Sequence, residues 1–91
     1  MGDTLSDDIL QIIRKRWEAS SPGPWISSVE GRDHPLGGET VILRGENREA
    51  DDLYLIGGTI ADYDFVANAK QDIPLLLAEI ERLKKLLASR S

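Results

Sequence analysis

The pattern of apolar and polar positions is clearest in the last third of the chain. Apolar side chains recur there with spacings of three, four, three and four, at Ile73, Leu76, Ile80, Leu83 and Leu87. This period keeps one seam of a helix against a partner helix. Leu75, Leu77 and Leu86 widen the apolar surface beyond the seam, so the helix has more than one face to bury. The five seam residues therefore predict a homo-oligomer.

The same reasoning predicts two further helices. Apolar residues at helical spacing indicate a first helix over residues 5–20, capped by Thr4 or Ser6 and stopped before Pro22. Its acidic first turn and basic last turns match the helix dipole. A second, short helix is expected over residues 62–71, with Asp62 as its N-cap. The leucine-rich helix then begins after a break at Asp72, with Pro74 in its first turn.

Alternating apolar and polar residues predict three short strands in the middle of the chain. They are expected over residues 24–30, 39–44 and 52–56, separated by loops rich in glycine and polar residues. Connections this short favour an antiparallel meander. The predicted fold class is α+β, in a single domain over residues 1–91. It comprises an N-terminal helix, a small antiparallel three-stranded sheet and two C-terminal helices, the last with the oligomerisation seam.

Composition narrows the possible chemistry. The 91 residues include no cysteine, which rules out disulfides, thiolate metal sites and cysteine nucleophiles and fits a reducing cytosol. The net charge of -5 disfavours binding to polymeric nucleic acid, which requires clustered positive charge. No apolar run approaches the roughly 20 residues of a membrane span, and the N-terminus is acidic where a signal peptide would be basic. We therefore expect neither nucleic acid nor a membrane as a partner.

Catalytic, phosphate-loop and metal patterns are weak. His34 lies beside Asp33 in a Pro/Gly loop, where a solvated histidine is more common than a general base. The Gly57-Gly58 junction lacks a phosphate-loop pattern and is followed by acidic residues. The carboxylates of residues 49–52 lack the spacing of a cation site. We predict no catalytic residue, no metal, no cofactor and no enzymatic activity.

Two blocks of the sequence resemble a known family. Residues 21–25 read S-P-G-P-W, and residues 62–83 read D-Y-D-F-V-A-N-A-K-Q followed by D-I-P-L-L-L-A-E-I-E-R-L. These blocks are similar to those of the Ead-like accessory proteins of phages and prophages. Members of that family tend to read P-G-P-W early and D-x-x-F-I-A-x-A-R-x-D-x-P-x-L-L-x-E-I-E-x-L late. The resemblance implies a phage protein that acts in the cytoplasm of the bacterial host.

Small acidic phage proteins that oligomerise are also similar in design to anti-defence sponges, which bind the cyclic nucleotide signals of bacterial immunity without cleaving them. A site for such a ligand needs a flat group that stacks on the base and cations that bind the phosphates. The stacking candidates are Trp25, Tyr54, Tyr63 and Phe65, and the phosphate candidates are Arg32, Arg44, Arg48 and Lys70. The predicted ligand-binding set is Trp25, Arg44, Arg48, Phe65 and Asn68. For each of these residues, a role in the core or on the solvated surface is the competing interpretation.

Two functions follow from these patterns. The first is sequestration of a cyclic nucleotide or cyclic ADP-ribose signal by a non-enzymatic, homo-oligomeric phage protein. The alternative is a phage accessory protein that inhibits a host protein by direct contact, through its acidic surface or its C-terminal helix.

Overall fold

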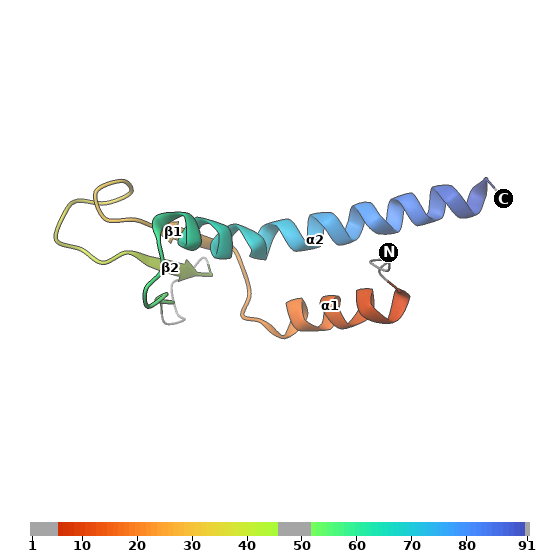
Figure 1. Cartoon of the computed structure of the whole chain (residues 1–91), viewed down its shortest axis with the longest axis horizontal. Helices are drawn as coiled ribbons and strands as arrows, with labels where there is room; N and C mark the ends of the chain where they lie inside the picture. The colour runs from red at the N-terminus through yellow and green to blue at the C-terminus, as the bar shows by residue number, and fades with distance from the viewer. Residues whose placement is uncertain (1–5, 46–51, 91) are drawn as a thin grey trace. The chain divides into compact units, whose positions relative to one another are not determined.

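The computed structural model describes residues 6–45 and 52–90. The elements are α1 (Asp7–Ala19), β1 (Trp25–Ser28), β2 (Val41–Arg44) and α2 (Ile60–Ser89), labelled in Figure 1. The chain divides into two compact units. We call Ser21–Gln71 the sheet unit, and Met1–Ser20 with Asp72–Ser91 the helical unit. The first turns of α2 belong to the sheet unit and its later turns to the helical unit. The prediction of an α+β chain is confirmed.

The sheet has two strands. β1 and β2 pair antiparallel, with Trp25 opposite Arg44. The predicted third strand over residues 52–56 is wrong, because only Leu53 in that segment pairs, through two backbone hydrogen bonds of 2.9 Å with Ile42. After that bridge the chain leaves the sheet, since the amide of Leu55 donates to the hydroxyl of Tyr63 on α2 at 2.9 Å. A side chain of the helix thus replaces further strand pairing.

Both strands are shorter than predicted, and the reason is visible at the end of β1. The carbonyl of Val29 accepts hydrogen bonds from the amides of Arg32 and Asp33, at 3.0 and 2.8 Å. The carboxylate of Asp33 accepts the amide of Val29 at 2.8 Å. These bonds close a tight turn in which Gly31 has a φ of 81°, a conformation that glycine adopts without strain. The turn therefore ends the strand before residue 30.

The core of the sheet unit lies between the sheet and the first turns of α2. Ile42 is completely buried and packs with Tyr63 and Ala67. Trp25, Leu53, Leu55 and Val66 are partly buried around them. In the first turns of α2 the buried positions are Tyr63, Ala67 and Lys70, which share one helix face because they are spaced by four and three residues. One face of the small sheet is thereby covered.

α2 is one continuous helix, so the predicted break at Asp72 is wrong. Its N-cap is Thr59 rather than Asp62. The amide of Asp62 donates to the Thr59 hydroxyl at 3.1 Å, and the amide of Thr59 donates to the Asp62 carboxylate at 2.9 Å, which forms a capping box. Pro74 lies inside the helix. An interior proline costs about 3 kcal/mol, and the helix persists because apolar residues continue at helical spacing on both sides of it.

α1 forms where the sequence predicts it. The hydroxyl of Ser6 accepts the amide of Ile9 at 3.2 Å and caps the helix, whereas the other predicted cap, Thr4, lies outside the described residues. Lys84 pairs with Asp7, and Arg14 pairs with Glu81 at 2.5 Å, so α1 runs antiparallel to the later turns of α2. Within the part of the chain that the structure describes, neither α1 nor α2 is long and apolar enough to cross a bilayer.

Candidate functional site

The structure places two of the predicted ligand-binding residues opposite each other. Trp25 begins β1, Arg44 ends β2, and the two are partners in the strand register. Both are partly buried. The Arg44 guanidinium donates to the hydroxyl of Ser21 at 2.9 Å, and the indole N–H of Trp25 donates to the carbonyl of Ser21 at 3.2 Å. Ser21 therefore connects the two side chains at the end of the sheet.

α2 adds a third member, Lys70. Its ammonium lies 5.6 Å from the centroid of the Trp25 ring, within the range of a cation–π interaction. Lys70 is only 7% exposed, and burial lowers the pKa of its ammonium because the charged form loses hydration. Trp25, Arg44 and Lys70 form an aromatic and cationic group that we call the Trp25 cluster. Of all the arrangements in the sheet unit, this one most closely resembles the predicted nucleotide site.

Gln71 holds the backbone of Trp25 in place. Its side-chain oxygen accepts the amide of Trp25 at 2.9 Å, and its side-chain nitrogen donates to the carbonyl of Trp25 at 3.0 Å. The same nitrogen donates to the carbonyl of Ala67 at 3.0 Å. One side-chain amide thus satisfies both backbone groups of Trp25, as a neighbouring strand would. This role could not be predicted, because Gln71 lies 46 positions after Trp25 and no pattern in the sequence indicates that the two meet.

The other predicted ligand-binding residues do not join the cluster. The side chain of Phe65 is 75% exposed. The side-chain amide of Asn68 donates to the carbonyl of Asp64, one turn earlier in α2, at 2.8 Å. Arg48 lies outside the described residues. Phe65 also lies on a different face of α2 from the buried Tyr63 and Ala67.

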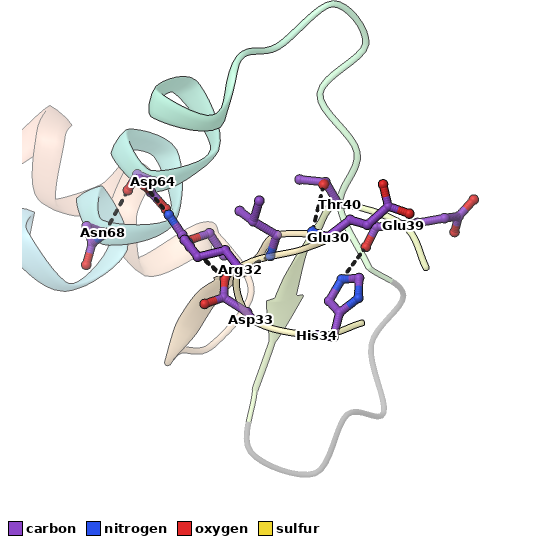
Figure 2. Close-up of polar contacts among 10 residues, drawn as sticks. Glu30, Arg32, Asp33, His34, Glu39, Thr40, Asp64 and Asn68 are labelled. Atoms are coloured by element: carbon purple, nitrogen blue, oxygen red, sulfur yellow. Dashed lines mark hydrogen bonds and ion pairs between the residues drawn. The ribbon is translucent and has the colours of Figure 1, made fainter. Parts of the chain in front are cut away.

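A second polar group, which the sequence analysis did not predict, fastens the loop after β1 to α2. Figure 2 shows Arg32 between Asp33 and Asp64. Its guanidinium donates to both carboxylate oxygens of Asp64, at 2.8 and 3.0 Å, and to the carboxylate of Asp33 at 2.8 and 3.0 Å. The Ser27 hydroxyl also donates to Asp64. Arg32 was a candidate for phosphate binding, but two carboxylates already occupy its donors.

The electrostatic effect of this group is clear. The bonds from Arg32, followed by that from Ser27, lower the pKa of Asp64 from 3.8 to about 2. Arg32 and the amide of Val29 also lower the pKa of Asp33. In turn, Asp64 and then Asp33 raise the pKa of Arg32. A carboxylate with a depressed pKa stabilises the fold above its unfolded pKa, and that contribution is lost as the pH falls toward the folded pKa.

We therefore expect wild-type protein to lose stability between pH 3.8 and about 2, where Asp64 takes up a proton in the unfolded state before it does so in the folded state. The urea midpoint should fall less across this window in Asp64→Asn than in wild type. Asp72→Asn, which removes an exposed carboxylate of the same helix outside this group, is the control. An equal fall in wild type and Asp64→Asn would contradict the assignment.

His34 is held by the backbone of its own loop. One ring nitrogen lies 2.8 Å from the carbonyl oxygen of Glu39, the contact drawn in Figure 2, and the other lies 3.1 Å from that of Pro35. The Asp33 carboxylate is engaged by Arg32 and the amide of Val29, so it does not orient His34 as a general base. Within residues 6–45 and 52–90, no three acidic or histidine side chains gather in a way that could hold a metal ion.

The predicted oligomerisation seam is divided between two environments. Ile73, Leu76 and Ile80 line a groove beside α1, whereas Leu83 and Leu87 lie beyond its lining. Ile73 and Ile80 are partly buried, but Leu76, Leu83 and Leu87 are 62%, 44% and 68% exposed. Three of the five seam residues therefore keep apolar side chains exposed within the described helical unit.

No protein-family model, no curated protein sequence and no solved structure matches this chain. The resemblance to the Ead-like accessory proteins therefore stays a prediction, and the function must be argued from the chain's own geometry.

Proposed function

We propose that this chain is a non-enzymatic phage accessory protein that acts as a homo-oligomer in the bacterial host cytoplasm and inhibits a host protein by direct contact. The observation that carries the proposal is the number of large apolar side chains left exposed on both units. In the sheet unit these are Ile26, Leu36, Tyr54, Ile56, Ile60 and Phe65. Large apolar side chains that remain exposed are available for contact with another protein, and we take these six as the candidate contact residues.

The distribution of charge supports separate roles for the two units. The sheet unit has nine acidic residues against four basic ones, which accounts for the whole net charge of -5. The helical unit has seven of each. An acidic surface with exposed apolar side chains fits a partner surface that is basic and apolar, because complementary charge guides encounter and selects the partner. We assign the host contact to the sheet unit and self-association to the helical unit.

A second candidate function is sequestration of a cyclic nucleotide or cyclic ADP-ribose signal. The observation that favours it is the Trp25 cluster, which brings a stacking ring together with two cations. Two features weigh against it. Arg32 is engaged by carboxylates, and Lys70 is buried beneath the chain's own packing. A phosphate would have to compete with these internal contacts, so we rank this function second.

Site-specific photo-crosslinking tests the host contact. A photoreactive amino acid placed at Ile56 or at Phe65, both exposed in the sheet unit, should form an adduct with the same protein in the expressing bacterium. The same amino acid at Arg90, an exposed position in the helical unit, serves as the control. The partner identified by mass spectrometry is then purified and titrated with the variants Ile56→Glu and Phe65→Glu.

We expect these two changes to weaken binding roughly tenfold or more, which corresponds to about 1.4 kcal/mol. Binding should also weaken with added salt, because the contact is partly electrostatic. Adducts that form equally from all three positions, or a purified partner that binds both variants as tightly as wild type, would overturn the proposal.

A further inference from the structure

The two sides of the helical unit differ in chemistry. On one side, the ion pairs Arg14–Glu81 and Lys84–Asp7 connect α1 to α2. On the other side lies a groove of about 220 Å³ whose lining is entirely apolar: Leu10, Ile13, Ile73, Leu76, Leu77 and Ile80. An engineered apolar cavity of roughly 150 Å³ is large enough to take up benzene. The groove can therefore accept large apolar side chains from outside the unit.

The helical unit buries very little by itself. Among its described residues only Leu77 is buried, and α1 has no buried residue. A pair of helices with a single buried side chain lacks the core that stabilises a fold of this size. Additional apolar surface from a partner would therefore stabilise the unit.

The helix face that lines the groove also carries exposed leucines that could fill the groove of another copy. Leu83 and Leu87 continue the stripe of Leu76 and Ile80 at helical spacing, and both are exposed. A surface that has both a groove and protruding leucines can pair with a copy of itself, as a two-fold symmetric interface requires. The equal numbers of acidic and basic residues in the helical unit also mean that two copies can approach without net repulsion.

We infer that the occupant of this groove is a second copy of the chain, and that two helical units pack groove to groove with Leu83 and Leu87 of each copy against the groove of the other. The inference rests on the homo-oligomer within the proposed function and specifies its interface. The ion-paired side of each helical unit then faces solvent.

Two neighbouring leucines provide a matched test. Leu76 and Leu75 are 62% and 69% exposed on the same helix, but only Leu76 lines the groove. Leu76→Glu should raise the dissociation constant of the dimer roughly a hundredfold or more, because two carboxylates would enter an apolar interface. Leu75→Glu should leave it within about threefold of wild type, as expected for a change outside an interface. Sedimentation equilibrium at micromolar concentration measures both.

A spectroscopic measurement covers the case in which Leu76→Glu fails to fold. The chain has no cysteine, so Leu76→Cys and Leu75→Cys each carry a single labelling site for an environment-sensitive dye. Dye at position 76 should shift to the blue at concentrations where the dimer forms and lose that shift on dilution, whereas dye at position 75 should not change.

The possible failures are distinguishable. A wild-type protein that sediments as a monomer removes both the interface and the oligomer, but leaves the host contact of the sheet unit to be tested by crosslinking. A dimer that is dissociated by Leu75→Glu and not by Leu76→Glu keeps the oligomer and overturns this interface. Concentration-dependent dye signals at position 75 alone would overturn it in the same way.

Discussion

Ile42→Ala is expected to lower the free energy of unfolding by about 2–5 kcal/mol, the usual cost of truncating a buried isoleucine to alanine. Ile42 has no exposed surface and lies where β2, the bridge to Leu53 and the first turns of α2 meet. The substitution would leave a cavity where the Ile42 side chain packs against Tyr63 and Ala67. Because small domains have a total stability of about 5–15 kcal/mol, the loss is large. Urea unfolding followed by circular dichroism measures it.

Ile26→Ala is the matched control, because it makes the same substitution on the neighbouring strand. Ile26 is 55% exposed and lies outside the core cluster. Its truncation should cost no more than about 0.5 kcal/mol, as is usual at exposed positions. If both substitutions lowered stability equally, the core would not lie between the sheet and α2 as described.

Features that depend on neighbouring residues could be predicted from the sequence. α1 follows from an apolar face at helical spacing, a capping serine and an acidic first turn, all within a few residues of one another. The positions of β1 and β2 follow from alternation, although the turn closed by Val29 and Asp33 shortens β1. Each of these signals is local, so tertiary packing did not need to be known.

The predicted third strand and the predicted helix break were wrong where distant residues decide the structure. Residues 52–56 alternate like a strand, but the Tyr63 hydroxyl binds the amide of Leu55 and draws the chain away from the sheet after one bridge. Asp72 and Pro74 are typical of a helix start. They are nevertheless interior to α2, because local signals for a cap do not outweigh a helix that has buried side chains both before them, at Ala67, and after them, at Leu77.

Only part of the candidate site could be predicted for the same reason. Trp25 and Arg44 have the chemistry of a nucleotide site, and the strand register brings them together. Phe65 and Asn68 have suitable chemistry as well, but neither joins the Trp25 cluster. The bonds that join Arg32 to Asp64 and Gln71 to Trp25 span 32 and 46 residues, so a pattern in one stretch of sequence could not reveal them.

Trp25→Ala is expected to cost about 3 kcal/mol, toward the lower end of the range for aromatic truncation because the ring is only partly buried. The substitution removes packing beside Ile42 and the aromatic face under Lys70, leaving a buried ammonium without its ring. Trp25→Phe keeps an aromatic face and loses the indole hydrogen bond to Ser21, so it should cost only about 1 kcal/mol. If both variants lost only about 1 kcal/mol of unfolding free energy, the ring would contribute nothing to stability beyond that hydrogen bond.

Nucleotide titrations of wild type and of these Trp25 variants distinguish the two candidate functions, contact with a host protein and nucleotide sequestration. Under the proposed function, calorimetric titration of wild type with cyclic dinucleotides, cyclic trinucleotides and cyclic ADP-ribose isomers should give no binding heat, and denatured protein should release no nucleotide. If the protein sequesters a nucleotide, Trp25→Phe should still bind it, because phenylalanine can stack on a base. Trp25→Ala should lose binding because it removes the ring, and Arg44→Glu should lose binding because it reverses the charge that would contact a phosphate. Arg44→Glu should remain folded, because Arg44 lies outside the apolar core. A loss of nucleotide binding in that variant would therefore identify the Trp25 cluster as the ligand site. Sequestration would then become the leading function.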